Sequence, residues 1–373
     1  MSLLPLLLIS SLLHGYVGVR VAPALPDGPW SGLFVALVIA SALLMPMALL
    51  ARRVRTQPWS DRLAWAGSLA MGLFSSLFVL TLLRDLWLAL AWLVSVPGGA
   101  ETTAAAVPLV GLAVTLWGFV NARRTAAVIA VDVPIDDLPA ALHGFTIAQI
   151  SDIHVGPTIK GAYLLRIVEA VNALGADMVA VTGDLVDGSV RELGPHVAPL
   201  AGLASRHGTF FVTGNHEYYS GAPAWVVELR RLGLRVLMNE HVVLEHGEAA
   251  LVVAGVTDHS AHHFNPAERS DPMAAIAGAP ARATVRVLLA HQPRSAELAE
   301  QAGFQLQLSG HTHGGQFLPW NLFVRLQQPF TAGLNRLRRL WVYTSRGTGY
   351  WGPPKRFGAA SEITHLRLVP AVR

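Results

Sequence analysis

Four long apolar stretches in the first third of the chain constrain its fold more than any other feature. They cover about residues 2–21, 31–50, 63–83 and 103–120, and the third leaves open a helical continuation to residue 96. Each is close to the ~20 residues that a helix needs to cross a bilayer. Breaks containing Gly and Pro at 26–29 and 97–99 separate them, and tryptophans lie near their ends, as is typical of membrane interfaces. The sequence therefore predicts an all-α bundle of about four transmembrane helices in residues 1–122.

The composition supports a membrane part. Hydrophobic residues make up 52% of the chain, charged residues make up 14%, and the mean hydropathy is +0.44, which is too apolar for an ordinary soluble protein. Buried helices of a globular core are the alternative, but successive segments with almost no polar face argue against it. A secretory signal peptide remains an alternative for the first stretch, although no basic residue precedes its apolar run.

The distribution of arginines predicts the orientation of the spans. The loop at 95–102 lacks Lys and Arg, and the first loop has only Arg20. The loop after the second stretch and the exit from the fourth are basic, with Arg52, Arg53, Arg55 and Arg62, and with Arg123 and Arg124. The positive-inside rule places both termini in the cytoplasm of a bacterial-type inner membrane protein with several spans. Arg84 and Asp85 either pair inside the bundle or mark the end of a span.

The chain lacks cysteine, which excludes disulfides and thiolate metal sites. Any metal must be held by His, Asp, Glu or Asn, and these ligands suit Mn, Mg, Fe or Zn. The net charge is +4 and the isoelectric point is near 9.7. Much of this excess is arginine beside apolar segments, which favours an anionic membrane surface over nucleic acid as the partner.

From about residue 126 the sequence becomes that of an α/β domain. Residues 123–144 would link the bundle to a domain at 145–373. Helices are predicted over 163–174 and 222–232, and a hairpin over 236–244 and 250–256. Further strands are predicted at 145–150, 178–182, 210–213, 285–290, 304–308, 340–344 and 362–368. The alternation of strands with amphipathic helices indicates the α/β class.

Five short motifs with metal-binding side chains follow these predicted strands. They are Ser151-Asp152-Ile153-His154, Thr182-Gly183-Asp184, Thr213-Gly214-Asn215-His216-Glu217, Ala290-His291 and Gly310-His311-Thr312-His313-Gly314-Gly315-Gln316. Strand ends are where α/β sheets display ligand-binding groups, and residues two apart in extended backbone point the same way. A lone Gly-Asp is usually a turn, and a lone His usually packs in a core. The whole set in this order predicts one metal site.

This order of motifs resembles the calcineurin-like metallophosphoesterase family over roughly residues 145–368. The Gly-His-x-His motif, the Ser-Arg-Gly-Thr-Gly run at 345–349 and a final strand at 362–368 are similar to its bacterial membrane-associated branch. That branch includes enzymes resembling UDP-2,3-diacylglucosamine pyrophosphatase. Glu217 stands where Asp is commoner, and residues 352–356 are a looser version of the branch's Gly-Pro-x-Arg pattern. The resemblance implies a central β-sandwich flanked by helices.

The resemblance also implies a dinuclear metal site and a role for each motif residue. One ion would be held by Asp152, His154 and His313, the other by Asn215, His291 and His311, and Asp184 would bridge both. Two dications about 3.5–4 Å apart can bind both the attacking and the leaving oxygen of a phosphoryl transfer and supply a bound hydroxide at neutral pH. His216 would give a proton to the leaving oxygen, or else would orient a ligand.

Three further features stay open. Asp187 is predicted to cap its loop rather than to bind a metal. The polar cluster of Asp258, His259, His262 and His263 is predicted to be a solvated loop, with a place in the substrate cleft as the alternative. The segment 317–340 mixes apolar residues with arginines, so it either rests on a membrane and admits a lipid or is a loop with its own packing.

The sequence thus predicts a metallophosphoesterase that hydrolyses a phosphoester or pyrophosphate bond with two divalent metal ions. A membrane-linked substrate, such as a UDP-diacylglucosamine-type lipid precursor, is expected because anchoring gives an enzyme no special gain on a soluble substrate. The alternatives are a broad-specificity phosphodiesterase or phosphatase, and a membrane sensor with an esterase output domain. The sequence indicates neither the metal identity nor the oligomeric state.

Overall fold

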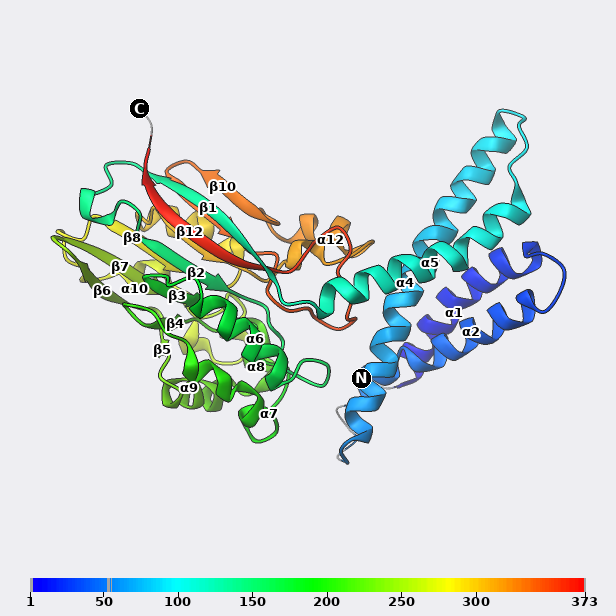
Figure 1. The fold of residues 1–373 in the computed structure, drawn as a ribbon, viewed down its shortest axis with the longest axis horizontal. Helices are drawn as coiled ribbons and strands as arrows, with labels where there is room; N and C mark the ends of the chain where they lie inside the picture. The colour runs from blue at the N-terminus through cyan, green and yellow to red at the C-terminus, as the bar shows by residue number, and fades with distance from the viewer. Residues whose placement is uncertain (1–2, 52–53, 55, 372–373) are drawn as a thin grey trace. The chain divides into compact units, whose positions relative to one another are not determined.

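The structure, a computed structural model, describes residues 3–51, 54 and 56–371. The chain divides into two compact units (Figure 1). The helical unit is Met1–Arg123 together with Phe317–Pro319 and Gly352–Phe357, and the sheet unit is the remainder. The predicted basic positions Arg52, Arg53 and Arg55 lie outside the described residues.

The apolar stretches form the predicted helices. These are α1 (Leu3–Val21), α2 (Trp30–Leu44), α3 (Met47–Leu50), α4 (Trp59–Leu93) and α5 (Ala100–Arg123). Four candidate spans are long and apolar enough to cross a membrane, with α2 and α3 forming one span at Trp30–Leu50. Pro46 separates α2 from α3, because proline cannot donate the backbone hydrogen bond that would continue a helix. The third stretch does continue as helix, to Leu93.

The charged residues of the third stretch are paired. Asp85 accepts hydrogen bonds from Arg20 Nε at 2.9 Å and from the Tyr16 hydroxyl at 2.8 Å. Arg84 donates to the carbonyls of Arg20 and Ala100, each at 3.0 Å. Such pairing removes most of the penalty for ionisable groups in an apolar bundle, and the partners Arg20 and Ala100 lie at the ends of α1 and α5.

Two short segments from the C-terminal half of the sequence pack within the helical unit. Lys355 Nζ donates to the Gly72 carbonyl at 2.8 Å and to Ser76 Oγ at 2.6 Å, both on α4. Ser75 Oγ donates to the Leu318 carbonyl at 2.5 Å. Residues 317–319 and 352–357 are therefore tied to α4 by polar contacts, although they lie more than 200 residues away in the sequence.

The sheet unit contains two six-stranded sheets. The first has the order β1 (Ala127–Ile135), β12 (Glu362–Pro370), β2 (Thr146–Ile150), β3 (Met178–Val181), β4 (Thr209–Phe211) and β5 (Arg235–Val236). The second has the order β10 (Gly333–Leu337), β11 (Leu340–Thr344), β9 (Leu306–Ser309), β8 (Val285–Leu289), β7 (Ala249–Gly255) and β6 (Glu240–His246). Strands β2 to β5 run parallel, as do β7, β8, β9 and β11. The predicted α/β class is confirmed.

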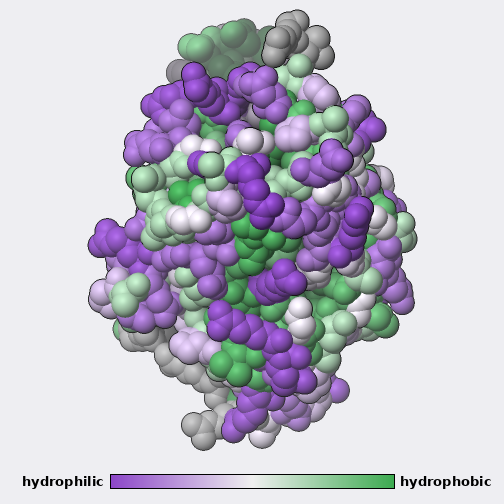
Figure 2. Space-filling model, turned by 90° about the vertical axis from the view of Figure 1, so that its left-hand side faces the viewer, coloured by the Kyte–Doolittle hydropathy of each residue, from purple (hydrophilic) through white to green (hydrophobic). Residues whose placement is uncertain are grey.

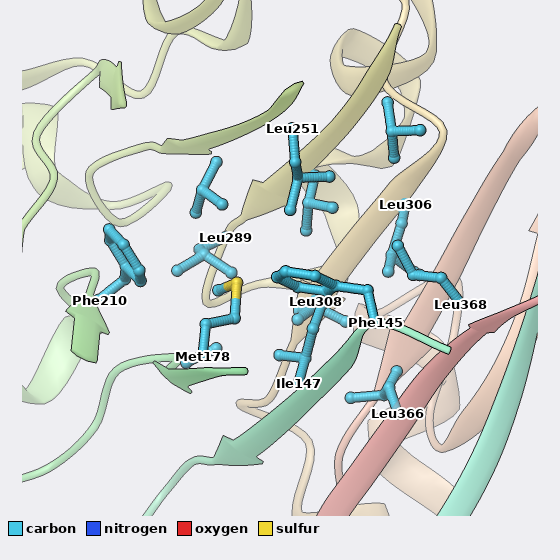
Figure 3. Close-up of a cluster of buried hydrophobic side chains, with 14 of the residues drawn as sticks. Phe145, Ile147, Met178, Phe210, Leu251, Leu289, Leu306, Leu308, Leu366 and Leu368 are labelled. Carbon is cyan, nitrogen blue, oxygen red and sulfur yellow. The ribbon is translucent and has the colours of Figure 1, made fainter. Parts of the chain in front are cut away.

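The two sheets enclose the main hydrophobic core. Side chains from the first sheet, such as Ile147 and Met178, meet side chains from the second, such as Leu289 and Leu308 (Figure 3). The opposite face of the second sheet packs on the alanines of two short helices, α10 (Pro272–Ile276) and α11 (Ala296–Gln301). This layering is the sandwich flanked by helices that the family resemblance implied.

Strand boundaries differ from the prediction in one instructive place. The predicted strand 236–244 is divided between the two sheets, because Val236 ends β5 and Glu240 begins β6. Asn239, between them, adopts φ 57°, which interrupts an extended chain. The predicted hairpin itself is present as the antiparallel pair β6 and β7.

The other helices of the sheet unit are α6 (Gly161–Asn172), α7 (Val190–Val197), α8 (Asn215–Ser220), α9 (Ala222–Arg231) and α12 (Trp320–Gln327). Helix α6 buries Leu164, Ile167 and Val168 along one face, the period expected for a helix that covers a sheet. Figure 2 shows a face that is mostly hydrophilic around a central hydrophobic strip.

Candidate metal centre

Five loops at the carboxyl ends of strands supply the predicted site residues. Asp152 comes two residues after β2, Asp184 three residues after β3, and Asn215 four residues after β4. From the second sheet, His291 and His311 come two residues after β8 and β9. Because these strands lie in the middle of their sheets, loops from both sheets meet at one end of the sandwich.

The structure brings the predicted His and Asp ligands, together with His216, into three overlapping sets. Within each set one ligand atom from every residue lies within 4.8 Å of the others. The sets are Asp152 with His154 and His313, His154 with Asp184 and His216, and Asp184 with His291 and His311. The first and last sets share no residue and match the two ligand groups that the resemblance implied, apart from Asn215.

Asp184 lies between these two groups. Its Oδ2 is 3.9 Å from His154 Nε2 on one side and 3.2 Å from His291 Nε2 on the other. Within the groups, the Nε2 atoms of His154 and His313 are 3.0 Å apart, and His311 Nδ1 is 3.2 Å from His291 Nε2. Ring nitrogens that converge on each other in this way present lone pairs to a common point, as metal ligands do.

The backbone of these loops is held in an uncommon conformation. Left-handed φ values between 51° and 70° occur at Asp152, His154, Asp184, His311 and His313. The left-handed conformation costs a non-glycine residue about 1 kcal/mol or more, and residues in this conformation cluster at functional sites. Five predicted ligands sharing this conformation indicate that packing elsewhere is used to aim their side chains.

Glycines allow the loops to approach each other closely. A Cβ on Gly310 would overlap Ser151 Oγ and Asp152 Oδ2, and a Cβ on Gly214 would overlap Asp184 Oδ1. The absence of a side chain at 310 lets the N–H of His311 donate to both oxygens of Asp152, at 2.9 and 3.0 Å. The glycine of the Gly-His-x-His motif is therefore required by this contact between loops.

Glu217 has a structural role that the sequence did not reveal. It is fully buried, and its carboxylate accepts backbone N–H groups from two loops. Oε2 accepts from Asp184 at 2.9 Å and from Gly214 at 2.7 Å, while Oε1 accepts from Leu185 at 2.7 Å and Val186 at 3.2 Å. Glu217 thus ties the Asp184 loop to the start of α8, which carries Asn215 and His216.

His216 and Asp187 form a close pair. His216 Nδ1 lies 2.5 Å from Asp187 Oδ1, and the second oxygen of Asp187 is 3.3 Å from His154 Nδ1. Burial by itself would lower the pKa of His216, but the charges of Asp184 and Asp187 outweigh it and raise the pKa to about 9. Asp187 is therefore more than the loop cap that the sequence suggested. Its spacing three residues after Asp184 was the one available signal.

The charge on Asp184 is stabilised by its surroundings. Burial by itself would raise the pKa of this carboxyl, but His291, His216 and His154 hold it well below its usual range. Asp184 is thus an anion placed among histidines. A carboxylate in that position is able to bind cations on both of its sides.

The cluster at 258–263 divides into a buried and an exposed part. Asp258 is buried, and its two carboxylate oxygens accept hydrogen bonds from Gln292 Nε2 at 3.1 and 3.0 Å. Gln292 directly follows His291 in the sequence. His259 and His263 are exposed. The expectation of a solvated loop is met by these two histidines and is wrong for Asp258.

Comparison with known proteins identifies the family. The model of the calcineurin-like phosphoesterase family matches residues 145–315. A transmembrane protein with metallophosphoesterase domain from Danio rerio is 35% identical over 95% of this chain and 84% of its own length. A protein of the same description from Bos taurus is 40% identical over 70% of this chain and 62% of its own length. An uncharacterized metallophosphoesterase from Helicobacter pylori is 40% identical over 60% of each chain.

The chain belongs to the calcineurin-like phosphoesterase family, and it is a metallophosphoesterase associated with a membrane. Its relatives extend beyond the matched part, since the chain spans about three fifths of the Bos taurus and Helicobacter pylori proteins. Members of this family bind divalent metal ions, and the clustered His and Asp residues are the candidates for that role here.

Proposed function

We propose that the chain hydrolyses a phosphoester or pyrophosphate bond at a dinuclear metal site bridged by Asp184. The observation that carries this proposal is the position of Asp184 Oδ2, within 4 Å of a histidine from each ligand group. One ion would be held by Asp152, His154 and His313, and the other by Asn215, His291 and His311, with Asp184 shared.

The residues present fit such a pair of ions. Asn215 Oδ1 is buried and has no hydrogen-bond partner within the part of the chain that the structure describes. A buried amide oxygen without a partner costs free energy, and a divalent cation would satisfy it. When bound, two such cations activate a water molecule and neutralise the charge of a phosphate group. The donor set of carboxylate, amide and imidazole suits Mn, Zn, Fe or Mg.

His216 is proposed to protonate the leaving oxygen. Its Nδ1 is engaged by Asp187, so the proton available for transfer is on Nε2, which lies 4.0 Å from Asp184 Oδ2. The contact of Nδ1 with Asp187 raises the pKa of His216, which favours the protonated ring that a general acid requires. Asp187 would act as a positioning residue that fixes the ring and its protonation state.

A substrate linked to membrane lipid is proposed, of the UDP-diacylglucosamine type found in the branch that the sequence resembles. Helix α12 supports this part of the proposal. Its residues are all exposed or half-buried, and they include Trp320, Leu322, Phe323 and Leu326, the last of which is 82% exposed. The helix begins close to the metal loop, because a Cβ on Gly315 would overlap Asn321. Exposed apolar side chains of this kind suit the interfacial region of a bilayer.

The catalytic domain is proposed to lie in the cytoplasm of a bacterial-type inner membrane, with the four apolar helices as spans. Support comes from Arg62, Arg123 and Arg124, which flank the spans on the side predicted to face the cytoplasm.

A substrate panel tests the proposed function. The full chain in detergent, loaded with one defined metal at a time, would be given lipid-linked nucleoside pyrophosphates and soluble phosphodiesters and monoesters. Faster hydrolysis of the lipid-linked compounds is expected. Equal rates on all soluble esters would favour the broad-specificity phosphodiesterase or phosphatase, and hydrolysis of none of them with any metal would contradict the proposal.

A further inference from the structure

Exposed aromatic rings stand next to His216. The ring of Tyr219 lies 5.3 Å from the His216 ring at an interplanar angle of 70°, and the ring of Trp351 lies 5.6 Å away at 74°. Tyr219 is 57% exposed and Trp351 is 52% exposed. Large aromatic side chains normally bury most of their surface, so two half-open rings beside one histidine suggest a bound partner.

Two hydrogen bonds fix the backbone of Trp351. The side-chain amide of Gln316 donates to the Trp351 carbonyl at 2.9 Å and accepts from the Trp351 N–H at 2.9 Å. Gln316 is itself buried, adopts φ 53°, and lies three residues after His313. A buried glutamine in a strained conformation thus fixes the backbone of Trp351 relative to the metal loop.

The ring of Tyr219 packs against Phe264, which lies in a different segment of the chain. Tyr219 lies on α8, three residues after His216, and its ring is 5.7 Å from that of Phe264. Phe264 also contacts Tyr218, whose ring is 5.5 Å away and largely buried. The orientation of Tyr219 therefore depends on packing that leaves much of its own ring open to solvent.

The position of these rings identifies the part of a substrate that they would contact. This step rests on the proposed function, because it takes His216 to be the proton donor. A general acid must lie within hydrogen-bond distance of the oxygen that departs. Side chains that border the acid then border the leaving group rather than the phosphoryl group retained between the metal ligands.

We propose that Tyr219 and Trp351 form a leaving-group subsite that binds a planar ring carried by the departing alcohol. Aromatic side chains attract flat rings by stacking or edge-to-face contact, and they do so with little dependence on ring identity. The ring is either an aryl group attached directly to the leaving oxygen or a nucleobase one sugar away from it. In a lipid-linked nucleoside pyrophosphate of the kind proposed above, the departing group would be a nucleoside monophosphate instead of an alcohol, and its nucleobase would lie one phosphate and one sugar from the leaving oxygen.

The test compares esters that differ only in the leaving group. The metal-loaded full chain would hydrolyse methyl phenyl phosphate, methyl hexafluoroisopropyl phosphate and the methyl ester of uridine 5′-monophosphate. The first two leaving groups have similar acidity, so demand for a proton from His216 is matched while only one carries a ring. Trp351→Ala and Tyr219→Ala should each raise KM for the phenyl ester about ten-fold. The value of kcat for that ester and the KM for the fluoroalkyl ester should hardly change.

Binding gives a second readout that does not depend on turnover. Benzylphosphonate, whose P–C bond is not hydrolysed, should bind the full chain more tightly than propylphosphonate, and Trp351→Ala should remove the difference. Trp351→Phe should retain most of it. Val227→Ser, which changes an exposed residue of α9 outside the site, is the matched control and should alter neither constant.

The outcomes separate this inference from the proposed function. An equal rise of KM for the phenyl and fluoroalkyl esters would overturn the ring subsite while leaving the phosphoesterase intact. Preference for the uridine ester over the phenyl ester, lost in Trp351→Ala, would assign the subsite to a nucleobase. If no ester is hydrolysed but benzylphosphonate still binds through Trp351, ring binding by Trp351 stands, while the proposed reaction and the leaving-group assignment both fall. Equal binding of both phosphonates would contradict the subsite.

Discussion

Replacement of Glu217 by Gln tests the architecture that positions Asp184. Each oxygen of the Glu217 carboxylate accepts two backbone N–H groups, from Asp184 and Gly214 at Oε2 and from Leu185 and Val186 at Oε1. Glutamine has nearly the same shape, but one of its two terminal groups is an amide NH₂ that donates instead of accepting. Whichever way the amide is turned, two buried N–H groups face a donor.

The loss of stability can be calculated from these two unpaired N–H groups. A buried donor left without a partner costs about 1–3 kcal/mol, so Glu217→Gln should destabilise the sheet unit by about 2–6 kcal/mol. For a unit of this size that corresponds to a fall in Tm on the order of 5–20 °C. The Asp184 loop and the start of α8 lose their common anchor, so metal binding should weaken as well.

The assay is thermal unfolding of the full chain in detergent, followed by intrinsic fluorescence with and without added Mn²⁺. Glu192→Gln is the matched control, because it makes the same Glu-to-Gln change at an exposed capping position on α7. Its Tm should shift by a small fraction of the Glu217→Gln effect. An unchanged Tm and unchanged metal affinity in Glu217→Gln would refute the reasoning, since they would mean that the four N–H groups do not require a carboxylate.

Four other predictions concern the acid, its pH dependence, the glycine contact and the membrane orientation. His216→Ala should retain the metal but slow hydrolysis by about 10²–10⁴, least for substrates with good leaving groups, and equal losses for activated and unactivated esters would argue against proton donation. In the unchanged chain, the rate on a poor leaving group should fall as pH rises through the pKa of His216, which the contact with Asp187 raises, because the acid loses its proton there, and a pH–rate profile measures this. Gly310→Ala should lower Tm and metal content together, because its Cβ would overlap Asp152, whereas Gly202→Ala, whose Cβ would make only an ordinary contact with Val168, should change neither. A fluorescent protein fused at the C-terminus should fluoresce and an alkaline phosphatase fused there should be inactive, and the reverse pattern would place the catalytic domain outside the cytoplasm.

The parts of the fold that could be predicted from the sequence are those with a local signal. The apolar stretches of the helical unit are visible because a helix that crosses a bilayer needs about 20 consecutive apolar residues. The runs of β2, β3 and β8 are visible because a strand that is covered on both faces is hydrophobic along its whole length. Strand β1 was not predicted, because its first four residues are exposed and because it pairs with β12, near the other end of the sequence. Pairing at such a distance leaves no pattern in a short window.

In the candidate site, too, the residues with a local sequence signal could be predicted, and those that depend on distant partners could not. Asp152, Asp184 and His311 could be found because each follows a strand directly and belongs to a recognisable motif. Asp187 and Glu217 were underestimated, since their roles depend on partners about 30 residues away that only the folded chain brings near. The left-handed backbone of the ligands was also beyond prediction, because it is imposed by packing against local preference.

Metal stoichiometry is the most direct measurement of the central claim, that Asp184 is shared by two ions. Elemental analysis of the purified full chain, beside Asp184→Asn and the control Asp177→Asn, should find two divalent ions per chain in the unchanged protein and in the control. The Asp184→Asn protein should retain one ion or none and lose hydrolysis, because a neutral amide cannot hold two cations together. Two bound ions and full activity in Asp184→Asn would contradict the account.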